Sequence, residues 1–143
     1  MPIFNNVPGG TLPSALAWSA TYIAALLLMQ LVLMTLVILQ RRSKRVAFGD
    51  GGDRALARAI RAHGNFTENV PAALAALVIL PLLGAATWLV HFVGGLMVIA
   101  RLFHAQGLHS PVIPSMGRIL GVVLTWASLI IAVIGLLVLA WLR

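Results

Sequence analysis

The sequence predicts an all-α integral membrane protein, a bundle of four transmembrane helices. Of its 143 residues, 61% are hydrophobic and 9% are charged, whereas about 25% of the residues of a soluble domain are charged. Four apolar runs each approach the ~20 residues that a helix needs to cross the hydrocarbon core. They lack the alternation of polar and apolar residues that transmembrane strands show, which excludes a barrel.

The basic residues predict the orientation of the chain. The formal net charge is +7, and seven of the ten Lys and Arg residues lie between positions 41 and 61. Two more, Arg101 and Arg118, flank the loop after the third apolar run. Because cytoplasmic loops carry an excess of basic residues, both loops are expected in the cytoplasm and both termini on the periplasmic side. The basic residues are not interleaved with exposed aromatics over a soluble surface, so we expect no nucleic-acid partner.

The chain has no cysteine. It therefore has no disulfide, no thiolate metal site and no cysteine nucleophile of its own, and any thiol chemistry must use the sulfur of a substrate. The sequence also contains no HExxH, Walker or GxSxG motif and no metal-ligand spacing. We expect no metal site.

Residues 1–13 are rich in Pro, Gly and Asn and predict a short lead-in without charged side chains. The four-helix membrane domain follows over residues 14–143. Its first helix, about 14–40, has Trp18 and Tyr22 near its start, where they suit the aromatic belt of a membrane interface.

The second helix is predicted over about 53–83. Asp53, which follows a glycine-rich turn, is a plausible N-cap. Pro71 lies inside this helix and is expected to kink or loosen it, which membrane helices tolerate when neighbours satisfy the freed backbone groups.

The third helix, about 86–106, follows an uncharged connection and forms a tight hairpin with the second. Gly94 and Gly95 allow a close helix contact there. The fourth helix, about 117–142, is apolar apart from small hydroxyl groups, and nothing in it indicates chemistry.

The second helix carries a polar stripe into an otherwise apolar segment. At about 100° per residue, five side chains share a face about 80° wide, namely Arg54, Arg58, Arg61, Asn65 and Glu68. Ionisable groups at membrane depth are costly unless they face a partner or a watery cavity. The first two are expected at headgroup level, where long side chains snorkel. The three deeper ones form either a structural polar cluster or a ligand site.

Glu68 is the decisive member of the stripe. It is the only glutamate of the chain, and a lone carboxylate at that depth must meet an arginine or the ammonium group of a ligand. Arg101 and His104, one turn apart, approach the same membrane half on the third helix, so we expect that Arg101 can reach Glu68. His104 is either a site residue or an interfacial histidine, and Arg118 is either a topology anchor or a cation aimed into the cavity. Such a pocket suits a ligand with several anionic groups and one ammonium group, next to an apolar partner in the lipid.

Two motifs resemble those of a known family. RAHGNFTENVP at residues 61–71 resembles the helix 2 signature of the membrane-associated proteins in eicosanoid and glutathione metabolism, the MAPEG family. ARLFHAQG at residues 100–107 is similar to the helix 3 signature of that family. The four-helix layout agrees over nearly the whole chain after residue 13. VAFGDGGD and the short hairpin look most like the small bacterial branch of the family.

The resemblance implies a homotrimer in the bacterial inner membrane. Its active sites would lie between subunits, face the cytoplasm and hold glutathione as a co-substrate. By position, Arg61, Asn65 and Glu68 would contact glutathione, with Glu68 facing the γ-glutamyl ammonium group.

The same resemblance assigns the remaining site residues. Arg101 and His104 match helix 3 positions that line the glutathione site, and Arg42 resembles the arginine lent by the neighbouring subunit. Arg118 is similar to the family's catalytic arginine that stabilises the thiolate, although the loop before it differs in length and contains two prolines. A cation of that kind lowers the pKa of a thiol from ~8.5 by one or more units.

The sequence departs from the family pattern at two positions. Leu108 stands where the eicosanoid enzymes carry a tyrosine, and Asn69 replaces an aromatic position of some members. These changes bear on binding strength and on eicosanoid-type specificity, whereas the core of the site is retained.

The expected function is that of a glutathione-dependent membrane enzyme, a microsomal-type glutathione S-transferase or peroxidase. It would direct the thiolate against lipophilic electrophiles or lipid hydroperoxides. The alternative is a non-catalytic membrane protein whose Arg/Glu cluster is structural or binds anionic lipid headgroups. A transporter or channel ranks last, because no charge lies deep in the first or fourth helix and no broken helix pair marks a midplane site.

Overall fold

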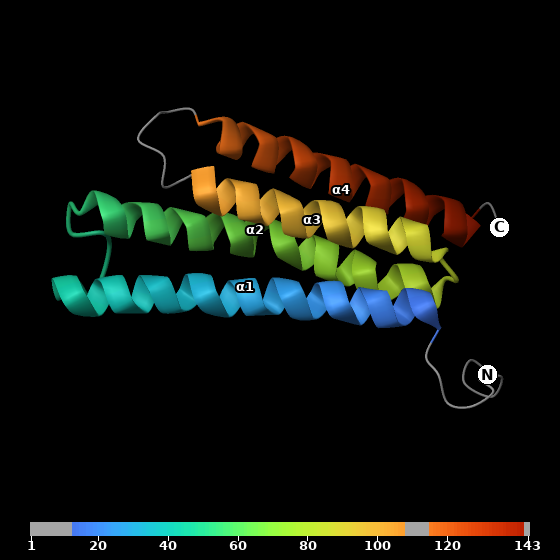
Figure 1. Cartoon of the computed structure of the whole chain (residues 1–143), viewed down its shortest axis with the longest axis horizontal. Coiled ribbons are helices and arrows are strands. Elements are labelled where there is room, and N and C mark those ends of the chain that lie inside the picture. Colours follow the sequence, from blue (N-terminus) through green and yellow to red (C-terminus); the bar gives the residue numbers. More distant parts are fainter. Residues whose placement is uncertain (1–12, 108–114, 142–143) are drawn as a thin grey trace.

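The computed structural model describes residues 13–107 and 115–141, and four antiparallel helices account for most of them (Figure 1). The helices are α1 (Ser14–Lys44), α2 (Arg54–Leu82), α3 (Thr87–Gly107) and α4 (Met116–Trp141). All four are long and apolar enough to cross a membrane. The predicted all-α four-helix membrane fold is therefore confirmed, whereas assembly as a trimer stays a prediction.

Some expectations fall on residues outside the described part of the chain. These are the lead-in up to residue 12, Leu108 and most of the loop that follows it. Within the described part, α1 continues four residues past Gln40, and α2 runs through Pro71 and Pro81 as one helix.

Nine of the ten basic residues lie toward one end of the bundle, which we call the charged end. α1 and α3 end there, and α2 and α4 begin there (Figure 1). The start of α1 and the end of α4 lie at the opposite end (Figure 1). This arrangement fits the predicted topology, in which both basic loops share one side of the membrane. That this side is the cytoplasm stays a prediction.

The link between α1 and α2 is fixed by one carboxylate. Asp53 caps α2 as predicted, because its side chain accepts hydrogen bonds from the backbone N–H groups of Ala55 (2.9 Å) and Leu56 (2.8 Å). The same carboxylate pairs with Lys44 in the last turn of α1. The hydrogen bond from Lys44, together with that from the N–H of Leu56, holds the pKa of Asp53 below its usual value of 3.8.

The helices α2 and α3 form the centre of the bundle. α1 packs on both of them, and α4 packs along α3 and also touches α2. α1 is the most exposed helix and buries only four residues, which are Ala15, Ser19, Leu26 and Leu33. Its outer surface is largely apolar, as expected for a helix that faces lipid or another protein chain.

Several side-chain hydrogen bonds join α1 to the centre of the bundle, and two of them involve imidazoles. Near the start of α1, Tyr22 Oη and His91 Nδ1 of α3 are 2.8 Å apart, and the Trp18 ring lies 4.8 Å from the His91 ring, centroid to centroid. Closer to the charged end, Gln30 Nε2 donates to His63 Nε2 of α2 over 3.0 Å. Both of these imidazoles therefore have a partner on α1, which limits the cost of burying them.

Close packing of α1 on α3 requires one of the two predicted glycines. Gly94 is buried, and a Cβ atom there would lie 2.4 Å from Cγ and 2.8 Å from Cβ of Tyr22. At Gly95, the nearest atom to an added Cβ would be Tyr22 Oη at 3.7 Å, which is ordinary contact distance. Only Gly94 is needed for the approach of the two helices.

We predict that Gly94→Ala destabilises the protein by about 1–3 kcal/mol, because the methyl group overpacks the α1–α3 contact. Gly95→Ala is the matched control, since it adds the same methyl group where there is room. Thermal unfolding in detergent should therefore show a lower Tm for Gly94→Ala and no loss for Gly95→Ala. Equal melting temperatures for the two variants would contradict the packing of Tyr22 on Gly94.

Candidate functional site

The exposed part of the candidate site is an ion pair on α2. Arg61 Nη1 lies 3.6 Å from Glu68 Oε1, and the two side chains are 63% and 56% exposed. The expected contact between Arg101 and Glu68 is not formed. Glu68 meets an arginine on its own helix two turns away, whereas Arg101 turns toward Asn65. The pair leaves most of the donors and acceptors of both side chains free for other partners.

The buried part of the site is the guanidinium group of Arg101. This residue is only 3% exposed. Its Nη1 donates to Asn65 Oδ1 over 2.6 Å and more weakly to the Asn65 carbonyl over 3.4 Å. Its Nη2 donates to the Thr125 hydroxyl and over 3.5 Å to the carbonyl of Gly121. The guanidinium thereby joins α2, α3 and α4.

The Arg101 charge is buried without a carboxylate partner. The chain has three acidic residues, and the ion pairs formed within the described residues are Asp53 with Lys44 and Glu68 with Arg61. The buried Nε atom of Arg101 also has no hydrogen-bond partner among the described residues. A buried cation that is held only by neutral dipoles favours an anion nearby.

His104 lies one turn beyond Arg101 and is 5% exposed. It packs against α4 so closely that a Cβ atom at Gly121 would be 2.7 Å from His104 Cβ and 2.9 Å from the Ala100 carbonyl. The charges of Arg101, Arg118 and Arg61 all act on its ring. One imidazole therefore sits in the positive field of arginines from three helices.

Of the last two predicted site residues, Arg118 lies at the edge of this cluster and Arg42 lies outside it. Arg118 is half-buried in the first turn of α4, where its backbone N–H donates to the Ser115 hydroxyl over 3.4 Å. Arg42 is exposed on the last turns of α1, a helix that does not contact α4 within the described residues. A single chain thus brings Asn65, Arg101 and His104 together and leaves Arg42 apart.

The sequence interpretation missed the contribution of α4. Thr125 is 1% exposed, and its hydroxyl donates to the Gly121 carbonyl over 2.6 Å while it accepts from Arg101. Thr125 and Gly121 lie in the apolar helix for which the sequence indicated no chemistry. The available signal was a glycine and a hydroxyl one turn apart, a pair that allows close approach and offers a polar partner inside a membrane bundle.

The arrangement suits anion binding better than metal chemistry. Among the described residues, no group of three or more His, Cys, Asp or Glu side chains could hold a metal ion. The cluster instead offers guanidinium groups, one amide and one imidazole at the charged end, with a carboxylate at its margin. These groups complement a ligand that carries carboxylates or phosphates.

Fold and site together define a four-helix integral membrane protein with a buried, arginine-centred polar site at one end. The sequence profile of the MAPEG family matches residues 19–138. The chain belongs to the MAPEG family. It is similar to the Inner membrane protein YecN of Escherichia coli strain K12, with 38% identity over 118 residues, which cover 81% of this chain and 87% of that protein. The protein of the same name from E. coli O6:H1 matches equally. No solved structure matches the chain.

We predict that Thr125→Val destabilises the protein by about 1–3 kcal/mol, because it leaves a buried donor of Arg101 unsatisfied. Thr125→Ser is the control that keeps the hydroxyl group and should retain most of the stability. Thermal unfolding of both variants in detergent measures the difference. A Thr125→Val protein that melts with the wild type while Thr125→Ser melts lower would show that Thr125 matters through its methyl group instead.

Proposed function

We propose that the protein is a glutathione-dependent enzyme of the bacterial inner membrane. In this proposal it activates the glutathione thiol against lipophilic electrophiles or lipid hydroperoxides. The observation that carries the proposal is the Arg101 guanidinium, which is buried beside Asn65 and has no carboxylate of this chain as a partner. Membership of the MAPEG family supports it, as does the similarity to an inner membrane protein.

Glutathione carries two carboxylates, one ammonium group and one thiol, and the cluster offers a complement for each. Arg61 and Arg101 supply guanidinium groups for the carboxylates, and Asn65 supplies an amide. Glu68 is the acceptor for the γ-glutamyl ammonium group. Its 3.6 Å separation from Arg61 exceeds the ~2.7–2.9 Å of a charge-assisted hydrogen bond, so the carboxylate is held loosely enough to exchange partners. His104 lies one turn beyond Arg101 in the same cluster.

Thiol activation is assigned to Arg118. A cation close to the sulfur stabilises the thiolate, so the proton leaves for solvent near neutral pH. The thiolate then forms a bond to the electrophilic carbon, and the leaving group departs with its bonding electrons. With a hydroperoxide, the thiolate attacks the outer oxygen and the O–O bond breaks to give the lipid alcohol. The resulting glutathione sulfenic acid condenses with a second glutathione to give a disulfide and water.

The proposed assembly is a homotrimer with its sites between subunits and its charged end in the cytoplasm. Arg42 of one chain would then complete the site of the neighbouring chain. The exposed, apolar surface of α1 supports a role in contacts with lipid or other subunits. The basic loops support the orientation.

The rival proposal is a non-catalytic protein whose polar cluster is structural. The bonds of Arg101 to Asn65, Thr125 and Gly121 favour it, because they join three helices without any ligand. Thermal stability in detergent separates the two. A ligand that binds the folded state raises stability by RT ln(1 + [L]/Kd), so glutathione should raise the Tm of an enzyme and leave that of a structural protein unchanged.

We predict that reduced glutathione binds saturably to the purified protein in isothermal titration, and that Glu68→Gln weakens the affinity about tenfold or more. The mutation removes a hydrogen bond between two charged groups, a bond worth about 1.5–3 kcal/mol. Asp50→Asn is the matched control, because it removes an exposed carboxylate from the charged end without touching the cluster. Absence of heat with the wild type, at a protein concentration that detects a millimolar Kd, would reject glutathione as the ligand.

We predict that Arg118→Ala keeps glutathione affinity but slows turnover about tenfold, since a thiol pKa raised by one unit lowers the thiolate fraction tenfold near neutral pH. Turnover is measured with a chromogenic aryl chloride and with a lipid hydroperoxide at saturating glutathione. Arg118→Lys, which keeps the cation, should retain most of the rate. Unchanged turnover in Arg118→Ala would transfer the role to another arginine of the cluster.

A further inference from the structure

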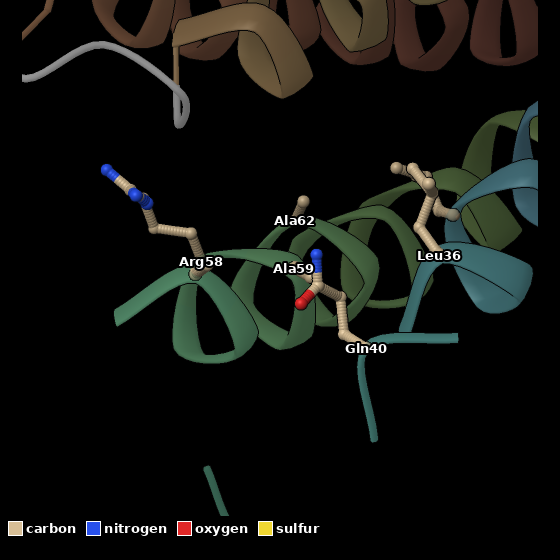
Figure 2. Close-up of a pocket in the computed structure, with 7 residues that line it drawn as sticks. Leu36, Gln40, Arg58, Ala59 and Ala62 are labelled. Atoms are coloured by element: carbon tan, nitrogen blue, oxygen red, sulfur yellow. The ribbon is translucent and has the colours of Figure 1, made fainter. Parts of the chain in front are cut away.

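A second concave feature lies between α1 and α2 at the charged end, on the side of α2 that faces α1 (Figure 2). We call it the α1–α2 groove. Its volume is about 110 Å³. Five of its seven lining side chains are apolar and two are polar, and they are Leu33, Leu36, Ala55, Ala59, Ala62, Gln40 and Arg58. The groove is separate from the polar cluster around Arg101, which joins α2, α3 and α4.

The length of α1 predicts that the groove lies at the boundary between hydrocarbon and headgroups. α1 has 31 residues, so at ~1.5 Å per residue it is about 46 Å long and exceeds the ~30 Å hydrocarbon core. If Trp18 marks the opposite interface, the ~20 residues that cross the core end near position 38. Leu33 and Leu36 then lie at acyl-chain depth, and Gln40 lies at headgroup depth.

The polar rim of the groove offers unused hydrogen-bond donors. Arg58 is exposed, and among the described residues its side chain forms neither a hydrogen bond nor an ion pair. Figure 2 shows its guanidinium group extending away from α2, while the carboxamide of Gln40 reaches from α1 toward Ala59. A guanidinium group presents donors in a fork that matches phosphate oxygens, and a carboxamide adds two more.

The surrounding charge favours an anionic lipid over a neutral one. Residues 41–61 carry seven basic and two acidic side chains, and one of the acidic side chains, Asp53, is already paired with Lys44. Basic segments at a membrane surface attract anionic headgroups. A zwitterionic lipid offers the same phosphate, but its ammonium group would be repelled by the neighbouring arginines.

We propose that the α1–α2 groove binds one anionic phospholipid. Its phosphate accepts hydrogen bonds from Arg58 and Gln40, and the upper part of an acyl chain lies on the apolar floor formed by α1 and α2. The floor is apolar, so an acyl chain fills it at a lower cost than water does. This site does not depend on glutathione binding.

The test is native mass spectrometry of the full-length protein released from nanodiscs that contain equal amounts of phosphatidylglycerol and phosphatidylcholine. The wild type should retain phosphatidylglycerol in preference to phosphatidylcholine. Arg58→Gln should lower the apparent affinity for phosphatidylglycerol about tenfold, as expected for loss of a charge-assisted bond. Arg54→Gln is the matched control, because it removes the same charge one turn earlier on the same stripe without touching the groove, and it should change the affinity less than twofold.

Two further measurements distinguish a bound phospholipid from a small phosphate ligand and from a second copy of the chain in the groove. Ala59→Leu fills the floor while leaving Arg58 in place, and it should displace the lipid. Glycerol phosphate, which has the headgroup chemistry without the chains, should fail to compete. Equal losses in Arg58→Gln and Arg54→Gln would show diffuse attraction and overturn the site. Retention of lipid in Ala59→Leu, or displacement by glycerol phosphate, would overturn the role of the floor. A groove covered by a second copy of the chain would show no lipid in any variant and would also overturn the proposal.

Discussion

Burial of the Arg101 guanidinium is the interaction on which the charged end of the bundle depends. A buried cation without a carboxylate is tolerated only where several dipoles are aimed at it. Those dipoles come from Asn65 on α2 and from Thr125 and Gly121 on α4. The three helices must therefore keep one rotation and one register relative to each other. The same register buries His104 against Gly121, so one packing arrangement positions both buried polar side chains of α3.

The charged end has many more basic than acidic side chains, and this imbalance favours the binding of anions. The chain has ten basic and three acidic residues, and two of the acidic residues are engaged by Lys44 and Arg61. Most arginines at this end must find anions outside the protein. On the side of α2 toward α3 and α4, the guanidinium groups and the amide of Asn65 suit the carboxylates of a small ligand. On the side toward α1, the apolar lining of the groove with Arg58 and Gln40 suits a phosphate with acyl chains. The two sides of α2 suit different ligands because polar side chains line one side and apolar side chains line the other.

The fold could be predicted because its signals are local. Four apolar runs and the cap at Asp53 depend on neighbouring residues only, and the helices follow from them. The site could be predicted only as a set of residues. The rotation of α3 about its own axis determines whether Arg101 contacts Asn65 or Glu68. The role of Thr125 could not be predicted either, because its hydroxyl group accepts a hydrogen bond from an arginine on another helix. The sequence of α4 alone does not reveal that partner.

The residues of the cluster differ in how deeply a single chain buries them. Arg101 and His104 are almost fully buried, whereas Arg61 and Glu68 are more than half exposed. The buried pair is fixed by packing within the chain and can serve as a rigid wall. Among the described residues the exposed pair has only itself as a partner, and it gains little stability from a contact open to solvent. Its conformation is therefore free to be set by whatever covers it, and a ligand or a neighbouring chain that does so would order these side chains as it binds. The division into a preformed wall and an adaptable rim is compatible with the proposed location of the site between subunits.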